Sequence, residues 1–385
     1  MELKDKQISF KEWWRQFAAS SSFPRWIITL FFVLVCALAI AQGLQLPKLL
    51  SDTVVRFGMN VILVLAMVPA IQSGIGPNFG LPLGVIAGLV GTLVSFEMGL
   101  VGLEGLIMAN VISLPISIIV GIVFGMMLNR VKGSEMIVST YTGFAIVSLM
   151  SIFWIFMPFK HPEMVWPLGR GLRNVVSLEG IYSKILSDMW SIKIFSEKAT
   201  GKLIFLFDKT EAYTKANFDS TLYVDIFAIP VFLLIIIALM CFALWLFMQS
   251  KVGITMKASG DNPRFAAASG INVDRSRIIG TTLSTVLAGI GITIFSQSYG
   301  FIQLYQAPLN AAFPAVAAIL IGGASAKSAK ISHVLIGTFL FNGLLVISLP
   351  ALNAMLPEGN LSEVLRLIVQ NGVILYALTK IGGES

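Results

Sequence analysis

The stretch KASGDNPRFAAASGINVDRSR, residues 257–277, is a short polar segment between long apolar segments. Its residue order predicts a small helix with a defined start and end. Asn262 is the expected N-cap, with Asp261 as the alternative, and Pro263 takes the first helical position, where a missing N–H costs nothing. Gly270 can adopt the left-handed conformation that ends a helix. A bounded helix of about two turns is therefore predicted in a loop, as is typical of an element held by a partner.

The composition of the chain indicates whether it folds in water or in a membrane. Of 385 residues, 56% are hydrophobic and 12% are charged, and the mean hydropathy is +0.85. A soluble domain carries about a quarter charged residues, so the sequence predicts an all-α polytopic membrane protein surrounded by lipid. The net charge of +7 is explained by basic cytoplasmic loops, and nucleic acid is not an expected partner. The two cysteines lie in apolar segments and the two histidines lie far apart, so no metal site is expected.

Ten apolar segments have about the length that crosses a bilayer. They cover residues 26–44, 54–71, 75–96, 102–128, 136–158, 223–248, 279–297, 307–323, 331–350 and 361–379. The segments near Gly76 and Pro314 predict one or two broken or re-entrant spans, and we expect two related halves. The expected regions are an interfacial N-terminal helix (1–25), spans 1–5 (26–158), an extracytoplasmic loop (159–222), span 6 (223–248), a cytoplasmic coupling loop (249–278), and spans 7–10 with a short tail (279–385).

The basic residues between these spans predict the orientation. With the N-terminus inside, fifteen Lys and Arg residues fall on the cytoplasmic side, and only Lys48, Arg56 and Arg366 fall on short outer segments. Both termini are therefore expected in the cytoplasm, with the chain in a bacterial inner or plasma membrane. Trp13 and Trp14 favour a surface helix at the N-terminus over a frayed tail, because paired tryptophans prefer the membrane interface.

The outer loop contains a second amphipathic pattern. Apolar residues follow helical spacing from Leu178 to Trp190, and Ser177 precedes them. This pattern predicts an amphipathic helix. It is either a docking surface for an external partner or a lid on the membrane face, and the pattern leaves both open.

The apolar spans lack the side chains of a catalyst. No ionisable residue lies near the centre of a predicted span, whereas ion-driven carriers usually place carboxylates there. Backbone carbonyls can still hold sodium, so ion coupling is disfavoured but stays open. No nucleophile is paired with a base, and no HExxH pattern is present. The sequence predicts a protein that moves a solute without its own energy source.

Two interrupted spans indicate where the solute passes. The third span begins SGIGPNFGLPLG at residues 73–84, and YGFIQ at residues 299–303 precedes Pro308 and Pro314. Broken spans in both halves point to a substrate path, where freed backbone amides can bind a neutral polar solute. The alternative is that these glycines only let helices pack closely. The expected lining residues are Gln72, Asn78, Phe79, Gln297, Gln303 and Tyr305.

The run GDNPRFAAASGINV, residues 260–273, resembles the signature of ABC importer permeases of the branched-chain amino acid, simple sugar and nucleoside superfamily. The segments LAGIGI at 287–292 and IGGA at 321–324 extend the resemblance over about the last third of the chain. The resemblance implies that the bounded helix is a coupling helix, which sits in a groove of an ATPase subunit. The residues expected there are Gly260, Asp261, Asn262, Pro263, Arg264, Phe265, Ala266, Ala267, Ser269 and Gly270.

The resemblance also implies the partners: an ABC ATPase, a second permease subunit that is identical or homologous, and an extracytoplasmic solute-binding protein. The chain has no GxxxxGK[ST] loop, so ATP and Mg are expected on the ATPase and no cofactor on this chain. The expected function is inward alternating-access transport of a small neutral polar solute, with a simple sugar or nucleoside favoured. A branched-chain amino acid permease, a self-contained carrier and a structural subunit are the alternatives. Residues 74–84 lack the acidic residue found in sugar and nucleoside variants, which leaves the solute open.

Overall fold

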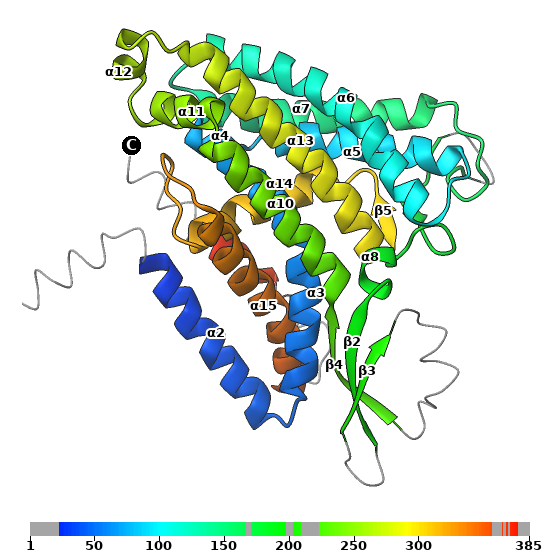
Figure 1. Ribbon diagram of the computed structural model, residues 1–385. Coiled ribbons are helices and arrows are strands. Elements are labelled where there is room, and N and C mark those ends of the chain that lie inside the picture. The colour runs from blue at the N-terminus through cyan, green and yellow to red at the C-terminus, as the bar shows by residue number, and fades with distance from the viewer. Residues whose placement is uncertain are drawn as a thin grey trace, which may run out of the picture.

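The computed structural model describes residues 23–166, 171–197, 203–208 and 223–355, together with 364, 367–368 and 370–375. These residues form a bundle of helices with two small antiparallel sheets at one end (Figure 1). The expected N-terminal surface helix and most of the tenth span, 361–379, lie outside the described residues.

The helices follow the apolar segments. Among the described residues, six helical segments are long and apolar enough to cross a membrane, and three apolar helices are shorter. The long ones are α3 (Leu46–Leu65) continued by α4 (Met67–Gln72), α6 (Gly102–Arg130), α7 (Glu135–Phe156), α10 (Val231–Gln249), α13 (Val273–Tyr299) and α15 (Ile331–Met355). The shorter ones are α2 (Phe23–Ala41), α5 (Leu81–Glu97) and α14 (Ala307–Ile321). The chain is therefore a multi-pass membrane protein, whereas the full count of ten spans stays a prediction.

The sixth predicted span differs from the expectation of helix throughout. Residues Tyr223–Pro230 form strand β4, and α10 begins only at Val231. Strand β2 (Ser191–Glu197) lies between β4 and β3 (Leu203–Asp208), and both pairings are antiparallel. The sequence YVDIFAIP is rich in β-branched and aromatic residues, and hydropathy alone does not distinguish such a run from the start of a helix. The all-α prediction is wrong for this part of the chain.

The amphipathic helix predicted after Ser177 is also wrong. Strand β1 (Val175–Ser177) is followed by turns and by the single helical turn α8 (Ile185–Asp188). Gly180 has a φ of 79° and Lys184 a φ of 53°, and such left-handed residues interrupt a right-handed helix. The apolar pattern identified only part of the buried set: Leu178, Tyr182 and Leu186 are almost fully buried, whereas Met189 and Trp190 are exposed. We call residues 171–190 the outer cap.

The two interruptions predicted in the spans are present. After α4, residues 73–80 form an irregular segment that contains Gly74 and Gly76 with φ of 80° and 88°. Gly300, with a φ of 88°, ends α13, and the short strand β5 (Phe301–Gln303) leads to α14. We call residues 73–80 the broken segment.

Helix α13 lies at the centre of the bundle and packs against α5 and α6. The contact is close because both sides present small residues: an added Cβ on Gly121 would lie 2.7 Å from Thr282 Cα. Helix α13 contributes a long run of buried residues, including Thr281, Thr285 and Gln297. It therefore connects the two ends of the bundle through its most buried part.

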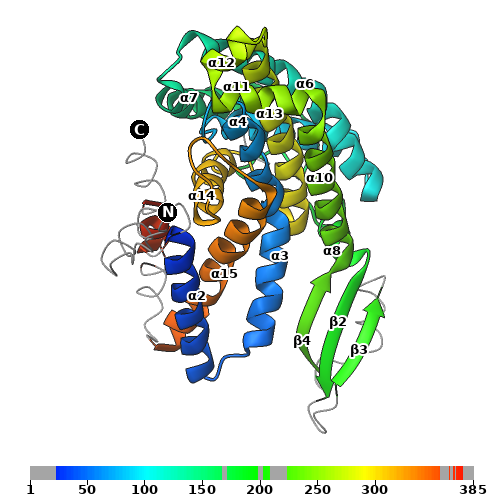
Figure 2. The ribbon, with the colours of Figure 1, turned by 60° about the vertical axis from the view of Figure 1, so that its left-hand side comes forward.

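The polar helices and the sheets lie at opposite ends. Helices α11 (Lys251–Asp261) and α12 (Pro263–Ala268) occupy one end, and α8 and strands β2 to β4 occupy the other (Figures 1 and 2). We call these the α12 end and the sheet end. The predicted placement of residues 249–278 and 159–222 on opposite sides of the membrane stays a prediction.

Candidate functional site

Helix α12 has the local structure that the sequence predicts. Asn262 is its N-cap, since its Oδ1 accepts a hydrogen bond from the Phe265 N–H at 3.1 Å. Pro263 is the first helical residue, and Gly270 has a φ of 80° beyond the last. Asn272 Oδ1 accepts from the Arg275 N–H at 2.9 Å and caps α13 in the same way. The N-cap prediction is confirmed, and Asp261 instead ends α11.

Most residues predicted to contact an ATPase lie on the surface of the α12 end. Phe265 is 69% exposed, which is unusual for a large aromatic side chain on a short helix. Ala266 faces inward and is fully buried, and Gly260 is half-buried. The remaining predicted residues are exposed: Asp261, Asn262, Pro263, Arg264, Ala267, Ser269 and Gly270. Their coupling role stays a prediction.

Helix α11 lies directly against the broken segment. An added Cβ on Gly260 would collide with the Gln72 carbonyl oxygen and would lie 2.8 Å from the Gly74 nitrogen. Only glycine permits this backbone approach. The backbone of α11 therefore lies directly against that of Gln72 and Gly74, without an intervening side chain.

Two of the predicted lining residues hold the broken segment in place. Asn78 is 1% exposed, its Nδ2 donates to Ser284 Oγ at 2.8 Å, and its Oδ1 accepts from the Gly80 N–H at 2.9 Å. Gln72 Nε2 donates to the Ala329 carbonyl oxygen at 2.5 Å. These amides bond to the protein itself, and neither lines the cavity described below.

A cavity of about 540 Å³ lies between α3, α13, α14 and α15, within the size range of small-molecule sites. Its position is toward the sheet end, because its wall includes the last turn of α13 and Gln303 of β5. Polar and aromatic side chains share the wall: Arg56, Asn60, Phe295, Tyr299, Gln303, Asn310, Phe313, Phe341, Asn342, Gln370 and Asn371. We call it the amide cavity.

The carboxamides of this cavity leave hydrogen-bonding capacity for a ligand. Asn60 Nδ2 donates to Asn342 Oδ1 at 3.1 Å and to the Arg56 carbonyl oxygen at 2.9 Å, which leaves Asn60 Oδ1 as an acceptor. Within the described part of the chain, the side-chain amides of Gln303 and Asn310 have no hydrogen-bond partner. Each amide supplies both donors and acceptors, so the wall suits a neutral polar solute.

The amide cavity borders the broken segment through an aromatic cluster. The Phe313 ring lies 5.8 Å from the Phe79 ring and 6.1 Å from the Phe144 ring, measured between centroids. Phe313 lines both the amide cavity and a narrow neighbouring space, which Phe79, Pro82 and Phe144 also line. Phe79 therefore lies where movement of the broken segment would change the shape of the cavity.

The outer cap holds the opposite side of the cavity through backbone pairing. Strand β1 pairs with β5 so that Val175 is opposite Gln303, and the Leu304 N–H donates to the Asn174 carbonyl at 3.1 Å. Gln297 is fully buried, with its Oε1 accepting from the Leu186 N–H at 3.3 Å and its carbonyl accepting from the Lys184 N–H at 2.6 Å. Gln297 is thus an anchor for the outer cap.

The predicted path is only partly brought together. Gln303 lines the amide cavity, Phe79 borders it, and Gln72, Asn78 and Gln297 bond within the protein. Tyr305 is half-buried against the apolar core. Sequence reasoning missed Arg56, Asn60, Asn310 and Asn342. A search for carboxamides within the spans finds Asn60 and Asn342, whereas a search for ionisable groups does not.

The described residues contain no group of three or more His, Cys, Asp or Glu side chains that would hold a metal ion. The side chains that line the amide cavity offer hydrogen bonding, aromatic packing and the positive charge of Arg56.

Comparison with known proteins identifies relatives. Residues 49–378 match the model of a family described as the branched-chain amino acid transport system permease component. The chain is also similar to the nucleoside ABC transporter permease protein NupC of Lactococcus lactis subsp. cremoris (strain MG1363), with 31% identity over 112 residues. That match covers 29% of this chain and 35% of the relative, so the chain spans about a third of the length of this curated relative. No solved structure matches the chain.

Proposed function

The chain belongs to the family of branched-chain amino acid transport system permease components, and from this premise we propose that it is the membrane subunit of an ATP-driven importer of a small neutral polar solute. The observation that supports this proposal is the placement of the amide cavity. It borders the broken segment, and the broken segment touches α11 beside α12. A push on α12 therefore has a short mechanical route to the solute.

The proposed solute is a simple sugar or a nucleoside. The amide cavity offers carboxamide donors and acceptors beside the aromatic rings of Phe295, Tyr299, Phe313 and Phe341, and sugars and nucleosides bind through such groups. A branched-chain amino acid is zwitterionic, and a carboxylate in the wall would favour its ammonium group over a neutral solute. The lining contains Arg56 but no carboxylate among the described residues. The similarity to a nucleoside permease over a short segment agrees with this choice.

Helix α12 is proposed to dock on a separate ATPase subunit in the cytoplasm. Phe265 supplies an exposed apolar side chain for a groove, and the caps at Asn262 and Gly270 keep the helix short and rigid. ATP and Mg would bind that subunit and not this chain. The proposed orientation has both termini inside, and it is supported by the fifteen basic residues on segments placed inside against three on the short outer segments.

The sheet end is proposed to face the outside, where a solute-binding protein delivers its ligand to the outer cap. A second permease subunit would complete the pair on which two ATPases act. The cavity would open outward to receive the solute and inward after ATP-driven movement of α12, as alternating access requires.

Uptake into proteoliposomes tests this function. The chain is reconstituted with the ATPase and the solute-binding protein that co-purify with it, and ATP-dependent uptake of labelled uridine, ribose and leucine is measured. We expect uptake of uridine or ribose, and its loss in Phe265→Asp with the chain still in the membrane. An exposed Ala268→Ser substitution on the same helix, outside the predicted contact set, is the matched control. Uptake of leucine alone would favour the amino acid alternative, and uptake by the chain without the ATPase would overturn the importer.

A further inference from the structure

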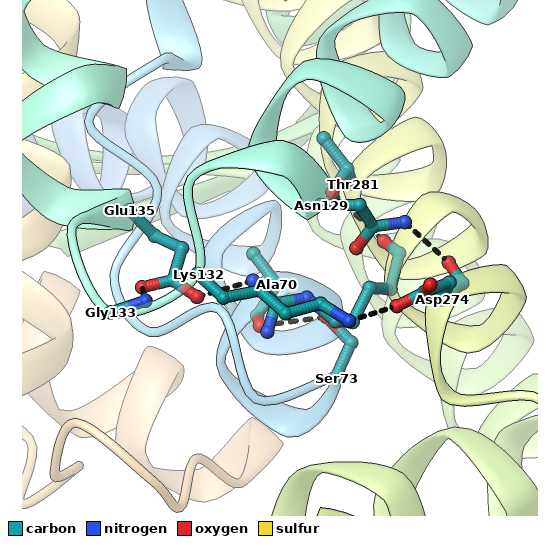
Figure 3. A network of polar contacts seen from close by, with 9 residues as sticks. Ala70, Ser73, Asn129, Lys132, Gly133, Glu135, Asp274 and Thr281 are labelled. Atoms are coloured by element: carbon teal, nitrogen blue, oxygen red, sulfur yellow. Dashed lines mark hydrogen bonds and ion pairs between the residues drawn. The ribbon is translucent and has the colours of Figure 1, made fainter.

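A polar network joins the turn between α6 and α7 to the first turns of α13 (Figure 3). Asn129 Nδ2 donates to the Asp274 carbonyl oxygen at 2.9 Å, and Lys132 Nζ lies 2.5 Å from the Asp274 carboxylate. Arg277 forms an ion pair with Glu135 Oε1. The Gly133 N–H donates to the other oxygen of the same carboxylate at 2.8 Å. The two ion pairs thus connect the same two segments.

The two ion pairs differ in burial. The Lys132 and Asp274 side chains are 52% and 54% exposed, whereas those of Arg277 and Glu135 are 8% and 14% exposed. Solvent and salt weaken an exposed pair, so it contributes little to holding the two segments together. A buried pair is screened much less, and loss of one partner leaves an uncompensated charge. The Arg277–Glu135 pair is therefore the stronger of the two ion pairs in this network.

The buried pair is expected to add little to the free energy of unfolding. Arg277 Nε has no hydrogen-bond partner in the described residues, so the cost of burying the guanidinium is incompletely offset. Apolar residues of similar size would stabilise such a contact at least as well. What an ion pair adds is a defined relative position of the two segments.

Helix α7 extends from Glu135 to the aromatic cluster beside the amide cavity. Gly143 lies so close to the broken segment that an added Cβ would be 3.0 Å from the Phe79 carbonyl oxygen. The next residue, Phe144, contacts Phe313, which lines the amide cavity. A displacement of the start of α7 therefore reaches the same residues as a displacement of α11.

We propose that Glu135 and Arg277 are positioning residues that join α7 to the coupling loop, so that α7 and α12 move as one body when the ATPase acts. This inference rests on the proposed function, and it gives the coupling helix two routes to the cavity. One route runs through Gly260 to the broken segment. The other runs through Arg277 and Glu135 along α7 to Phe144.

The first test separates a positional from a structural role. The double variant E135M/R277M replaces the ion pair by apolar side chains of similar length, so we expect thermal unfolding close to that of the wild type. Proteoliposomes containing the complete complex are assayed for ATP hydrolysis and for uptake of the solute that the wild type accumulates from uridine, ribose and leucine. We expect uptake per ATP hydrolysed to fall about tenfold. The conservative variant R277K keeps the ion pair and should stay near the wild type, as should K132M at the exposed pair. Wild-type uptake per ATP in E135M/R277M would overturn the inference.

The second test keeps Glu135 and Arg277 in place and uses only a labelled complex that retains ATP-dependent uptake. Spin labels are placed at the exposed positions 134 and 268, by Ser134→Cys and Ala268→Cys in a C36A/C241A background, and their separation is measured without nucleotide and with ATP and vanadate. We expect one narrow distance distribution that is the same in both states. A distance that changes between the states would show that the two segments move independently and would overturn the inference. Absence of ATP-dependent uptake by the wild type would instead refute the proposed function.

Discussion

The α12 end and the outer cap are both joined to the amide cavity, but by different kinds of contact. At the α12 end, a close glycine approach at Gly260 and the buried Arg277–Glu135 pair connect the polar loops to the spans. At the outer cap, backbone hydrogen bonds connect β1 to β5, and the Gln297 side chain accepts one more. The contact at the α12 end depends on one ion pair and on the missing side chain of Gly260. The contact at the outer cap is distributed over the backbone hydrogen bonds between β1 and β5.

This difference has a mechanical consequence. Where two segments are held by one or two contacts, a single substitution is enough to uncouple their movement. A contact made of several backbone hydrogen bonds tolerates the loss of one of them, because the others keep the strand register. We therefore expect substitutions at the α12 end to affect transport more strongly than substitutions of comparable chemistry at the outer cap.

The largest effect is expected for Gly260→Val. The added side chain would collide with the Gln72 carbonyl, which is backbone and yields only if α11 moves away from the broken segment. We expect uptake to be lost, with ATP hydrolysis by the assembled complex retained. Gly372→Ala is the matched control, because an added Cβ there meets no atom within 4 Å. Normal uptake in Gly260→Val would mean that the broken segment is not driven through α11.

The contact at the α12 end is the part that the sequence predicts best. Caps at Asn262, Asn272 and Gly270 depend on neighbouring residues, so their geometry follows from local order. Gly260 was predicted only as part of a family pattern, because its close approach to Gln72 depends on a chain segment almost two hundred residues away. The Arg277–Glu135 pair was not predicted for the same reason.

The outer cap shows where prediction from local pattern fails. The spacing of Leu178, Tyr182 and Leu186 correctly identified buried residues, but it was assigned to a helix. Pairing of β1 with β5 decides the conformation instead, and that partner lies beyond α10 and α13 in the chain. The amide cavity was missed in part because Asn60 and Asn342 meet only after α3 and α15 pack together.

An intermediate effect is expected for Gln297→Leu at the outer cap. The substitution leaves the buried Leu186 N–H without its acceptor, which costs about 1–3 kcal/mol, while the β1–β5 pairing persists. We expect uptake to fall about threefold, well short of the loss in Gly260→Val. Uptake by proteoliposomes with the binding protein supplied outside measures this. Ser183→Ala, within the same cap, is a control that leaves Gln297 in place. A loss as complete as that of Gly260→Val would show that the two contacts are equally fragile.

The smallest effect is expected for Tyr182→Phe, and its size depends on pH. Tyr182 is buried in the outer cap, and its hydroxyl donates to the Thr92 carbonyl oxygen at 3.1 Å. Burial raises the pKa of Tyr182 well above its ordinary value, and the hydrogen bond to Thr92 offsets only part of this. The protonated phenol is therefore favoured in the folded cap, so its contribution is complete at neutral pH and declines as the pH rises above the ordinary tyrosine pKa of about 10.

At pH 7, Tyr182→Phe should cost about 1 kcal/mol, the value of one hydrogen bond, with uptake almost unchanged. Hydrogen exchange in peptides from residues 171–190 reports the local stability. Between pH 9 and pH 11, exchange rates corrected for the intrinsic effect of pH should rise in the wild type more than in the variant, because the variant has no phenol to ionise. An equal rise in both proteins would show that the outer cap opens without ionisation of Tyr182. Since the backbone ladder between β1 and β5 is unaffected by this substitution, a small effect here and a large one at Gly260 would together establish that the contact at the outer cap is the tolerant one.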